Sequence, residues 1–214
     1  AVGATTKPQE IVRDFVDVLS PEPVMPELLG VRFTRALFGP AIGEPLGPLP
    51  FVPVWSVATD EAPYACAALP AGSLEGAVAV VRRGECPFAD KAYYAQSAGA
   101  VAALVVNTDD AITEMACSGT RCGAGVVRIP TVMVGRTAGD RLVAWRTLHA
   151  DATLRLDPRG RLIDVAGDIL ADYSARGPAY GRRIAPDVVA PGEAILSAGL
   201  PTAGGAAVYT QASG

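Results

Sequence analysis

The sequence predicts an α/β fold, in which a mixed, mostly parallel sheet is flanked by two helices. One observation is that short apolar runs, typical of buried strands, alternate with longer segments in which small and apolar residues recur at helical spacing. The other is that glycine or proline stands at the junctions between these runs. Because the order is strand, helix, strand, helix, strand, the strands should run parallel through right-handed crossovers.

The central series can be placed element by element. The first helix, residues 87–98, starts with Pro87, which suits a first helical turn. Phe88, Ala92 and Ala95 fall on one face of it, and the small residues there would let the helix pack closely on a sheet. The predicted strands are residues 77–82, 101–106, 131–134 and 152–156, and the second predicted helix is 137–148.

The chain on either side of this series differs in composition and in the length of its predicted elements. Many of its 18 prolines fall between residues 8 and 50, and proline disfavours long helices and central strands. Short elements punctuated by glycine and proline follow the central series, and they cannot form a core alone. We expect strands at 1–7, 12–19 and 31–37, a loop up to Leu49, a polar linker at 157–160 and short elements over 172–198.

The composition excludes several classes of protein. Half of the 214 residues are hydrophobic and the mean hydropathy is +0.29, so the chain is not disordered. A net charge of −4 and a pI near 5.0 give no basic patch for nucleic acid. The longest apolar run, residues 101–106, is far shorter than the ~20 residues that span a bilayer. We therefore expect no nucleic-acid partner and no membrane span in this segment.

Four cysteines, Cys66, Cys86, Cys117 and Cys122, leave three interpretations open. Their spacing matches no zinc pattern, which disfavours a metal site. Buried free thiols are a second interpretation. Disulfides are favoured, because Cys66 precedes and Cys86 follows the strand at 77–82, while Cys117 and Cys122 would clip a short loop. Two such bridges predict an oxidising compartment, whether secreted and extracellular or vacuolar and endomembrane.

The most specific motif is the stretch 80–91, Val-Val-Arg-Arg-Gly-Glu-Cys-Pro-Phe-Ala-Asp-Lys. It leads to Ala-Gly-Ala and a strand that ends at Asn107. This order of strand, Arg-Gly turn, Cys-x-Phe, lysine-bearing helix and Ala-Gly-Ala strand resembles the protease-associated (PA) domain. Ile-Pro at 129–130 and Gly-Asp-Arg-Leu at 139–142 match later parts of that family. The resemblance covers residues 33–156.

Sequences outside that region resemble subtilisin-like serine proteases, the subtilases. Tyr-Ser-Ala-Arg-Gly-Pro at 173–178 and Ala-Pro-Asp-Val-Val-Ala-Pro-Gly at 185–192 match two segments of that family. Residues 1–4 resemble its strand after the oxyanion asparagine, and Ala-Ser-Gly at 212–214 resembles the residues that lead to its nucleophile motif. The resemblance implies a partial subtilase segment at 1–32, a PA domain at 33–156 and a second partial subtilase segment at 157–214.

This resemblance implies a non-catalytic fragment of an endopeptidase, because the family's catalytic Asp, His and Ser fall outside these segments. Nucleophilic serine catalysis needs a base, yet the only histidine, His149, is expected at a helix end, and the only asparagine, Asn107, ends a strand. No catalytic, cofactor-binding or metal-binding residue is expected. The PA domain would serve substrate access, exosite binding or subunit pairing. Its expected partners are the rest of the catalytic domain, peptide or protein substrates, and a second copy in a homodimer.

Other functions stay open. The PA resemblance also allows a binding module of a sorting receptor or of a membrane-anchored ubiquitin ligase, although residues 172–198 match subtilases instead. The parent could also be a catalytically dead subtilase homologue. Two charged clusters are interpreted as solvated loop or helix faces rather than as a cation site and a binding surface: Asp109, Asp110 and Glu114, and Glu85 and Asp90 near Arg82, Arg83 and Lys91.

Overall fold

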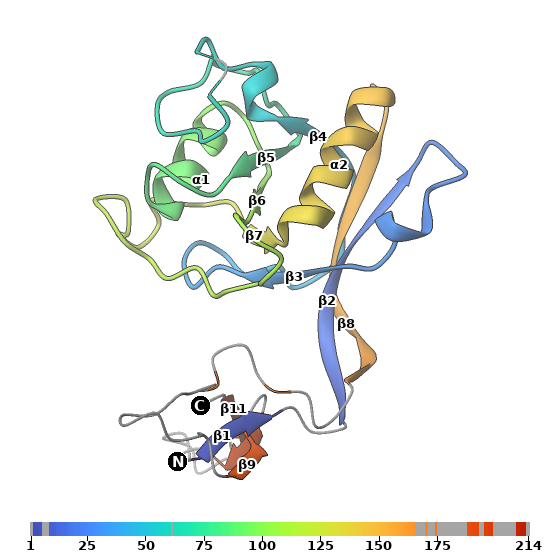
Figure 1. The fold of residues 1–214 in the computed structure, drawn as a ribbon. Helices are drawn as coiled ribbons and strands as arrows, with labels where there is room; N and C mark the ends of the chain where they lie inside the picture. Colours follow the sequence, from blue (N-terminus) through green and yellow to red (C-terminus); the bar gives the residue numbers. More distant parts are fainter. Residues whose placement is uncertain are drawn as a thin grey trace, which may run out of the picture. The chain divides into compact units, whose positions relative to one another are not determined.

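The computed structural model describes residues 2–5, 9–60, 62–165, 170, 174, 188–192, 195–198 and 209–212. The chain divides into two compact units, which Figure 1 shows together. The larger unit is Arg13–Arg161, and the smaller one combines Ala1–Val12 with Leu162–Gly214. Both helices and all four cysteines belong to the larger unit.

Seven strands close into a barrel in the order β2–β3–β7–β6–β5–β4–β8. Its β4–β5–β6–β7 part is parallel, whereas β3 and β8 join that part in antiparallel pairing. The mixed, largely parallel sheet predicted from the sequence is therefore confirmed, and closure into a barrel is an additional feature. The strands are β2 (Gln9–Ser20), β3 (Val31–Arg35), β4 (Leu46–Pro53), β5 (Val78–Arg82), β6 (Ala102–Val106), β7 (Thr131–Val134) and β8 (Thr153–Val165).

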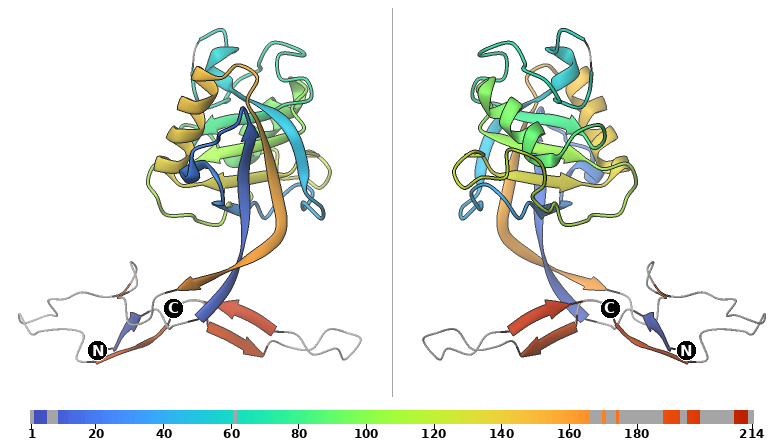
Figure 2. Two further views of the ribbon diagram at one scale, coloured as in Figure 1. Left: turned by 90° about the vertical axis from the view of Figure 1, so that its right-hand side faces the viewer. Right: turned by 90° about the vertical axis from the view of Figure 1, so that its left-hand side faces the viewer.

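Alternate residues of the parallel strands face two different cores. Val80 faces the barrel interior, which α2 (Arg136–Leu148) also helps to fill, and Val81 faces α1 (Phe88–Ser97). Both faces are buried, which explains why these strands are continuous apolar runs. Figure 2 shows the two predicted helices on different sides of the sheet. In the described parts of the chain, neither helix is long and apolar enough to cross a membrane. Two short 3₁₀ helices are η1 (Pro26–Leu28) and η2 (Val54–Ser56).

The expectation that prolines exclude a central strand is wrong for β4. It contains three prolines, yet it pairs with β8 and with β5. The pairing changes partner along the strand: the part up to Pro50 pairs with β8, and the part from Phe51 pairs with β5. The register shifts between Leu46 and Leu49, an irregularity of the kind where proline is tolerated. The predicted loop was therefore wrong from Leu46 onward.

The predicted linker at 157–160 is also wrong, because these residues lie inside β8. Asp157 is 5% exposed, and its carboxylate accepts two hydrogen bonds from the Arg159 guanidinium at 2.9 and 2.6 Å. Polar residues can therefore continue this strand, because the buried carboxylate is paired with a guanidinium. The compact unit is accordingly wider than residues 33–156, since β2 and β8 are needed to close the barrel.

A buried aspartate joins the two strands that complete the barrel. Asp17 of β2 is 4% exposed. One carboxylate oxygen accepts a hydrogen bond from the Gly30 N–H at 2.8 Å, and the other accepts hydrogen bonds from Arg155, at 3.3 Å, and Arg161 of β8. Burial raises the pKa of Asp17, but the hydrogen bonds from Arg161, Gly30 and Arg155 outweigh it and hold this pKa below its ordinary value.

Among the described residues of the smaller unit, four strands form two separate pairs. One pair is parallel and the other antiparallel. The Ser174 hydroxyl accepts a hydrogen bond from the Ala4 N–H at 2.9 Å, so the first and last stretches of the chain meet in this unit. Of the two subtilase-like motifs, at 173–178 and 185–192, only Ser174 and residues 188–192 lie within the described residues. The strands are β1 (Val2–Thr5) with β9 (Val188–Pro191), and β10 (Ile195–Ala198) with β11 (Tyr209–Ala212).

We expect Asp17→Asn to lower the free energy of unfolding at neutral pH by about 1–3 kcal/mol, because it removes the charge that pairs with two arginines. The folded pKa of Asp17 is lowered, so its contribution is present above the unfolded pKa of about 3.9 and is lost as pH falls through the folded pKa. Urea unfolding at a series of pH values measures this, and the difference between the two proteins should shrink in acid. Asp151→Asn, at an exposed position, is the matched control. A difference that stays constant down to strong acid would contradict this account.

Candidate binding site

A pocket of about 410 Å³ lies where the parallel strands β5 and β6 end. The backbone of this edge is held together, because Arg83 N–H donates to Val106 O at 2.9 Å and Asn107 N–H donates to Val134 O at 3.0 Å. In sheets of this kind, ligands bind outside the carboxyl ends of the strands. The start of α2 forms the remaining wall. The pocket is lined by Tyr64, Arg82, Arg83, Val106, Asn107, Thr108, Arg136 and Asp140.

The pocket carries an excess of positive charge. Arg82, the last residue of β5, pairs with Asp140 at 2.6 Å, and its guanidinium lies 5.5 Å from the centre of the Trp55 ring. Arg136 pairs with the same carboxylate at 3.7 Å, one helical turn away. Three arginines therefore face a single aspartate among the lining residues. Such a pocket attracts an anionic group.

Arg83 is positioned by an amide rather than by a carboxylate. Its Nη1 donates to Asn107 Oδ1 at 2.9 Å, and its guanidinium lies 5.7 Å from the centre of the Phe88 ring. The Asn107 amide group in turn donates to Ala111 O at 2.6 Å and to Asp109 Oδ1 at 3.1 Å, which fixes its orientation. Among the described residues, Arg83 has no carboxylate partner. Its charge is therefore available to a ligand, and a guanidinium suits the bidentate geometry of a carboxylate.

The turn that follows Arg83 requires glycine. Gly84 has φ of +131°, and a Cβ atom placed there would lie 3.0 Å from the Tyr64 ring. The ring of Tyr64 can thus pack against the backbone of the turn. This close approach makes Tyr64 one wall of the pocket.

A buried lysine, Lys91, binds the backbone of this turn. The Lys91 ammonium donates to Gly84 O at 2.6 Å and to Tyr64 O at 2.8 Å, and it lies 3.5 Å from Cys86 Sγ. Lys91 is fully buried, and burial lowers its pKa to about 8, while the charges of Glu85 and Asp90 act in the opposite direction. The expectation that this charged cluster is a solvated face is therefore wrong for Lys91.

Two disulfides each close a loop of the larger unit. Cys66 is joined to Cys86, and Cys117 is joined to Cys122, which are the pairs that the sequence favours. The first ties the segment after Tyr64 to the Arg-Gly turn. The loop closed by the second is held against α1, because Arg121 in that loop lies 3.6 Å from the centre of the Tyr93 ring.

The aspartates considered for a cation site have other roles. Asp110 accepts hydrogen bonds from the Thr137 N–H and hydroxyl, both at 2.7 Å, and so caps the start of α2. Asp109 accepts from the Asn107 amide and from the Ala111 N–H at 2.9 Å. Within the described ranges, no group of His, Cys, Asp and Glu residues could hold a metal ion. His149 caps the end of α2, where its ring lies 4.2 Å from that of Trp145.

The sequence analysis did not predict this pocket. It named Arg82 and Arg83 in the motif at 80–91 but interpreted their cluster as a solvated face, and Tyr64 and Arg136 lie far from that motif in sequence. Arg136 could have been found, because it follows a predicted strand and opens the next helix, and such positions meet at one edge of a parallel sheet. Nothing in the sequence indicates that Tyr64 returns to this edge.

Removing each disulfide should have unequal effects. The Cys66–Cys86 bridge closes a loop of 20 residues and should contribute about 3 kcal/mol, against about 2 kcal/mol for the Cys117–Cys122 bridge, which spans 5. Unfolding of the two double Cys→Ser variants measures this, and peptide mapping without reductant checks the pairs. A peptide in which Cys66 is joined to Cys117 or Cys122 would refute the pairing.

Comparisons with known proteins point to one domain family. Residues 49–142 match the family model of the PA domain. The PIII-type proteinase of Lactococcus lactis subsp. cremoris (strain SK11) is 35% identical over 129 residues, which are 58% of this chain and 6% of the proteinase. The minor extracellular protease Vpr of Bacillus subtilis (strain 168) is 35% identical over 131 residues, 60% of this chain and 15% of the protease. The subtilisin-like protease SBT1.6 of Arabidopsis thaliana is 29% identical over 132 residues, 58% of this chain and 16% of that protein.

The chain thus spans a small part of these relatives. Among solved structures, the aminopeptidase from Aneurinibacillus sp. strain AM-1 superposes with a TM-score of 0.46 and 20% identity, over 74% of this chain and 36% of that one. This likeness is too distant to indicate a function. The family match instead agrees with the Arg-Gly-Glu-Cys-Pro-Phe motif and with the sheet and two helices around it. The chain therefore carries a protease-associated domain.

Proposed function

We propose that this chain is a non-catalytic segment of a secreted subtilisin-like serine endopeptidase, and that its PA domain binds peptide substrates at an exosite. The observation that carries the exosite is the pocket at the carboxyl ends of β5 and β6. Arg83 there is oriented by Asn107 and has no carboxylate partner among the described residues. A side-chain or terminal carboxylate of a peptide has the charge and planar shape that such a guanidinium binds.

Several observations support an endopeptidase as the parent. The relatives above are named a proteinase, an extracellular protease and a subtilisin-like protease. The stretches before and after the larger unit, Ala1–Val12 and Leu162–Gly214, are connected in the smaller unit through β1 and β9 and through Ser174. This pairing is what one sheet interrupted by an insertion would give. Two disulfides favour an oxidising compartment such as the extracellular space.

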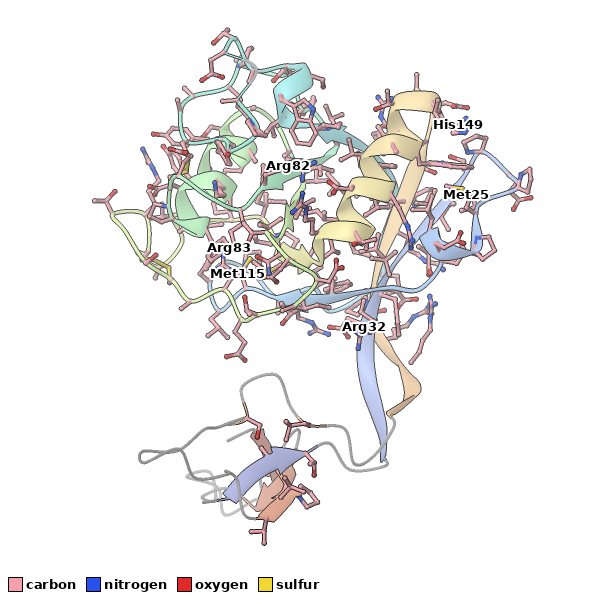
Figure 3. The ribbon with its side chains drawn as sticks, in the orientation of Figure 1. Met25, Arg32, Arg82, Arg83, Met115 and His149 are labelled. Atoms are coloured by element: carbon pink, nitrogen blue, oxygen red, sulfur yellow. A yellow bond between two sulfur atoms is a disulfide. The ribbon has the colours of Figure 1, made fainter. Side chains whose placement is uncertain are left out.

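The sole histidine is a poor candidate for a catalytic base. The tilted ring of His149 contacts Trp145 at the end of α2, whereas the pocket lies at the start of this 13-residue helix, about 20 Å away. Figure 3 shows His149 apart from Arg82 and Arg83. A base must reach the nucleophile by a hydrogen bond. Peptide-bond hydrolysis would therefore be carried out by the remainder of the catalytic domain, which we propose as the main partner of this chain. A homodimer stays a further prediction.

The 214-residue chain should not react with a fluorophosphonate probe, because a serine becomes nucleophilic only beside a base. Mass spectrometry after incubation measures labelling, and active subtilisin in the same tube shows that the probe is intact. Stoichiometric labelling of any serine of this chain would overturn its non-catalytic assignment.

The exosite is tested by peptide binding. We expect a fluorescent peptide rich in Asp and Glu to bind the chain more tightly than a peptide in which Asn and Gln replace them. Arg83→Gln should weaken binding of the acidic peptide about 5- to 20-fold, in line with loss of a charge-assisted hydrogen bond, and should abolish the preference between the peptides. Fluorescence anisotropy at low salt measures both affinities.

Arg32→Gln provides the matched control. Arg32 lies on β3, is exposed, and does not line the pocket, yet the substitution makes the same change in net charge. Figure 3 shows its position relative to Arg83. If Arg32→Gln weakened acidic-peptide binding as much as Arg83→Gln, the attraction would be non-specific and the exosite proposal would fail.

A further inference from the structure

The contact between Lys91 and a disulfide is not explained by the pocket. Two hydrogens of the buried ammonium are taken by Tyr64 O and Gly84 O. Nζ also lies 3.5 Å from Cys86 Sγ, 3.8 Å from Cys66 Sγ and 5.3 Å from the centre of the Tyr64 ring. In the part of the chain that the structure describes, no carboxylate forms an ion pair with Lys91. The ammonium is therefore buried beside two neutral sulfur atoms.

This arrangement favours cleavage of the disulfide. A buried charge that forms no ion pair is costly, and a disulfide sulfur is only a weak acceptor. A thiolate at the same place would be a counter-ion at hydrogen-bond distance, and thiolates next to lysine are stabilised. The charge on Lys91 consequently stabilises a product of the cleavage more than it stabilises the intact bond.

The two sulfur atoms differ in surroundings. Both cysteines are half-buried, but Cys66 lines a second pocket, of about 370 Å³, together with Asp60, Tyr64 and Glu85. Cys86 does not line that pocket, and its sulfur is the one nearer to the ammonium. A reagent that arrives through the pocket meets Cys66 first, and the sulfur that departs is then Cys86.

We propose that the Cys66–Cys86 disulfide is a thiol-exchange site for low-molecular-weight thiols. The thiol loses its proton to solvent, and its thiolate attacks Cys66 Sγ. A new S–S bond forms between the small thiol and Cys66, the Cys66–Cys86 bond breaks, and Cys86 leaves with the electron pair as a thiolate beside Lys91. A second small thiolate can attack the mixed disulfide, giving a soluble disulfide and the Cys66 thiolate, so that two thiols together supply two electrons.

Opening of the Cys66–Cys86 disulfide would alter the candidate exosite through Tyr64. Tyr64 lies two residues before Cys66, its carbonyl accepts the Lys91 hydrogen bond, and its ring packs on Gly84 and lines the arginine pocket. Opening the disulfide frees the segment that carries this wall. The thiol chemistry itself does not rest on the proposed function, so the two can fail separately.

The first test needs no variant. The oxidised 214-residue chain is incubated at neutral pH with glutathione and iodoacetamide, and its peptides are mapped by mass spectrometry. We expect glutathione on Cys66 and alkylation on Cys86 at least 5-fold more often than the reverse, and the asymmetry should vanish in urea. Equal labelling of both cysteines in the folded protein, glutathione mainly on Cys86, or reaction of Cys66–Cys86 only in urea would overturn the proposal.

Lys91→Met tests the role of the charge. After full reduction, the rate of alkylation at Cys86 is followed against pH, with circular dichroism as the check on folding. The charged groups acting on Lys91 are Glu85 and Asp90, the latter paired with Arg121 at 3.8 Å. In the unsubstituted 214-residue chain, the Cys86 thiol should have a pKa below the ordinary 8.5. Lys91→Met should slow alkylation of Cys86 at neutral pH about 5- to 10-fold. Cys117 and Cys122 serve as internal controls. A Cys86 pKa of 8.5 or higher in the unsubstituted chain would refute the proposal, even if the Lys91→Met variant does not fold.

Discussion

The Lys91 ammonium is the interaction on which the candidate site depends. It joins the carbonyl of Tyr64 to the carbonyl of Gly84, and so connects the segment before Cys66 to the turn after β5. The disulfide fixes the same two segments covalently. The ammonium would be costly to bury alone, and the two carbonyl contacts offset much of that cost. With the turn held by Lys91, Arg82 and Arg83 line the pocket.

The packing of the sheet determines where a ligand can bind. Residues of β5, β6 and β7 are buried alternately against the barrel interior and against α1, so neither face of the sheet can accept a ligand. Only the ends of the strands remain. At the carboxyl ends, the start of α2 brings in Arg136 and Asp140, while Asp110 caps that helix through Thr137 and remains outside the pocket. The positive character of the pocket therefore results from where the chain turns and not from the composition, which is acidic overall.

The sequence was sufficient where structure is local. The strands around Val80, Leu104 and Val132, and both helices, were predicted because their periodicity and their flanking glycines and prolines lie within each segment. It was not sufficient where pairing is non-local. The prolines of β4 are tolerated because the strand changes partner at Pro50, and Asp157 continues β8 because Arg159 pairs with it. The burial of Lys91 follows from carbonyls 7 and 27 residues away, which no local pattern reveals.

Barrel closure also explains how such a domain can be inserted into another protein. The chain enters the larger unit along β2 and leaves it along β8, and these strands are neighbours in the closed barrel. Asp17 on β2 binds Arg155 and Arg161 on β8, so the two crossings are held together by charge as well as by the sheet. A domain whose two ends lie side by side can occupy a loop of a host without separating the host's own strands. The ion pairs of Asp17 therefore hold together the strand by which the chain enters this unit and the strand by which it leaves, and these are also the strands that close the barrel.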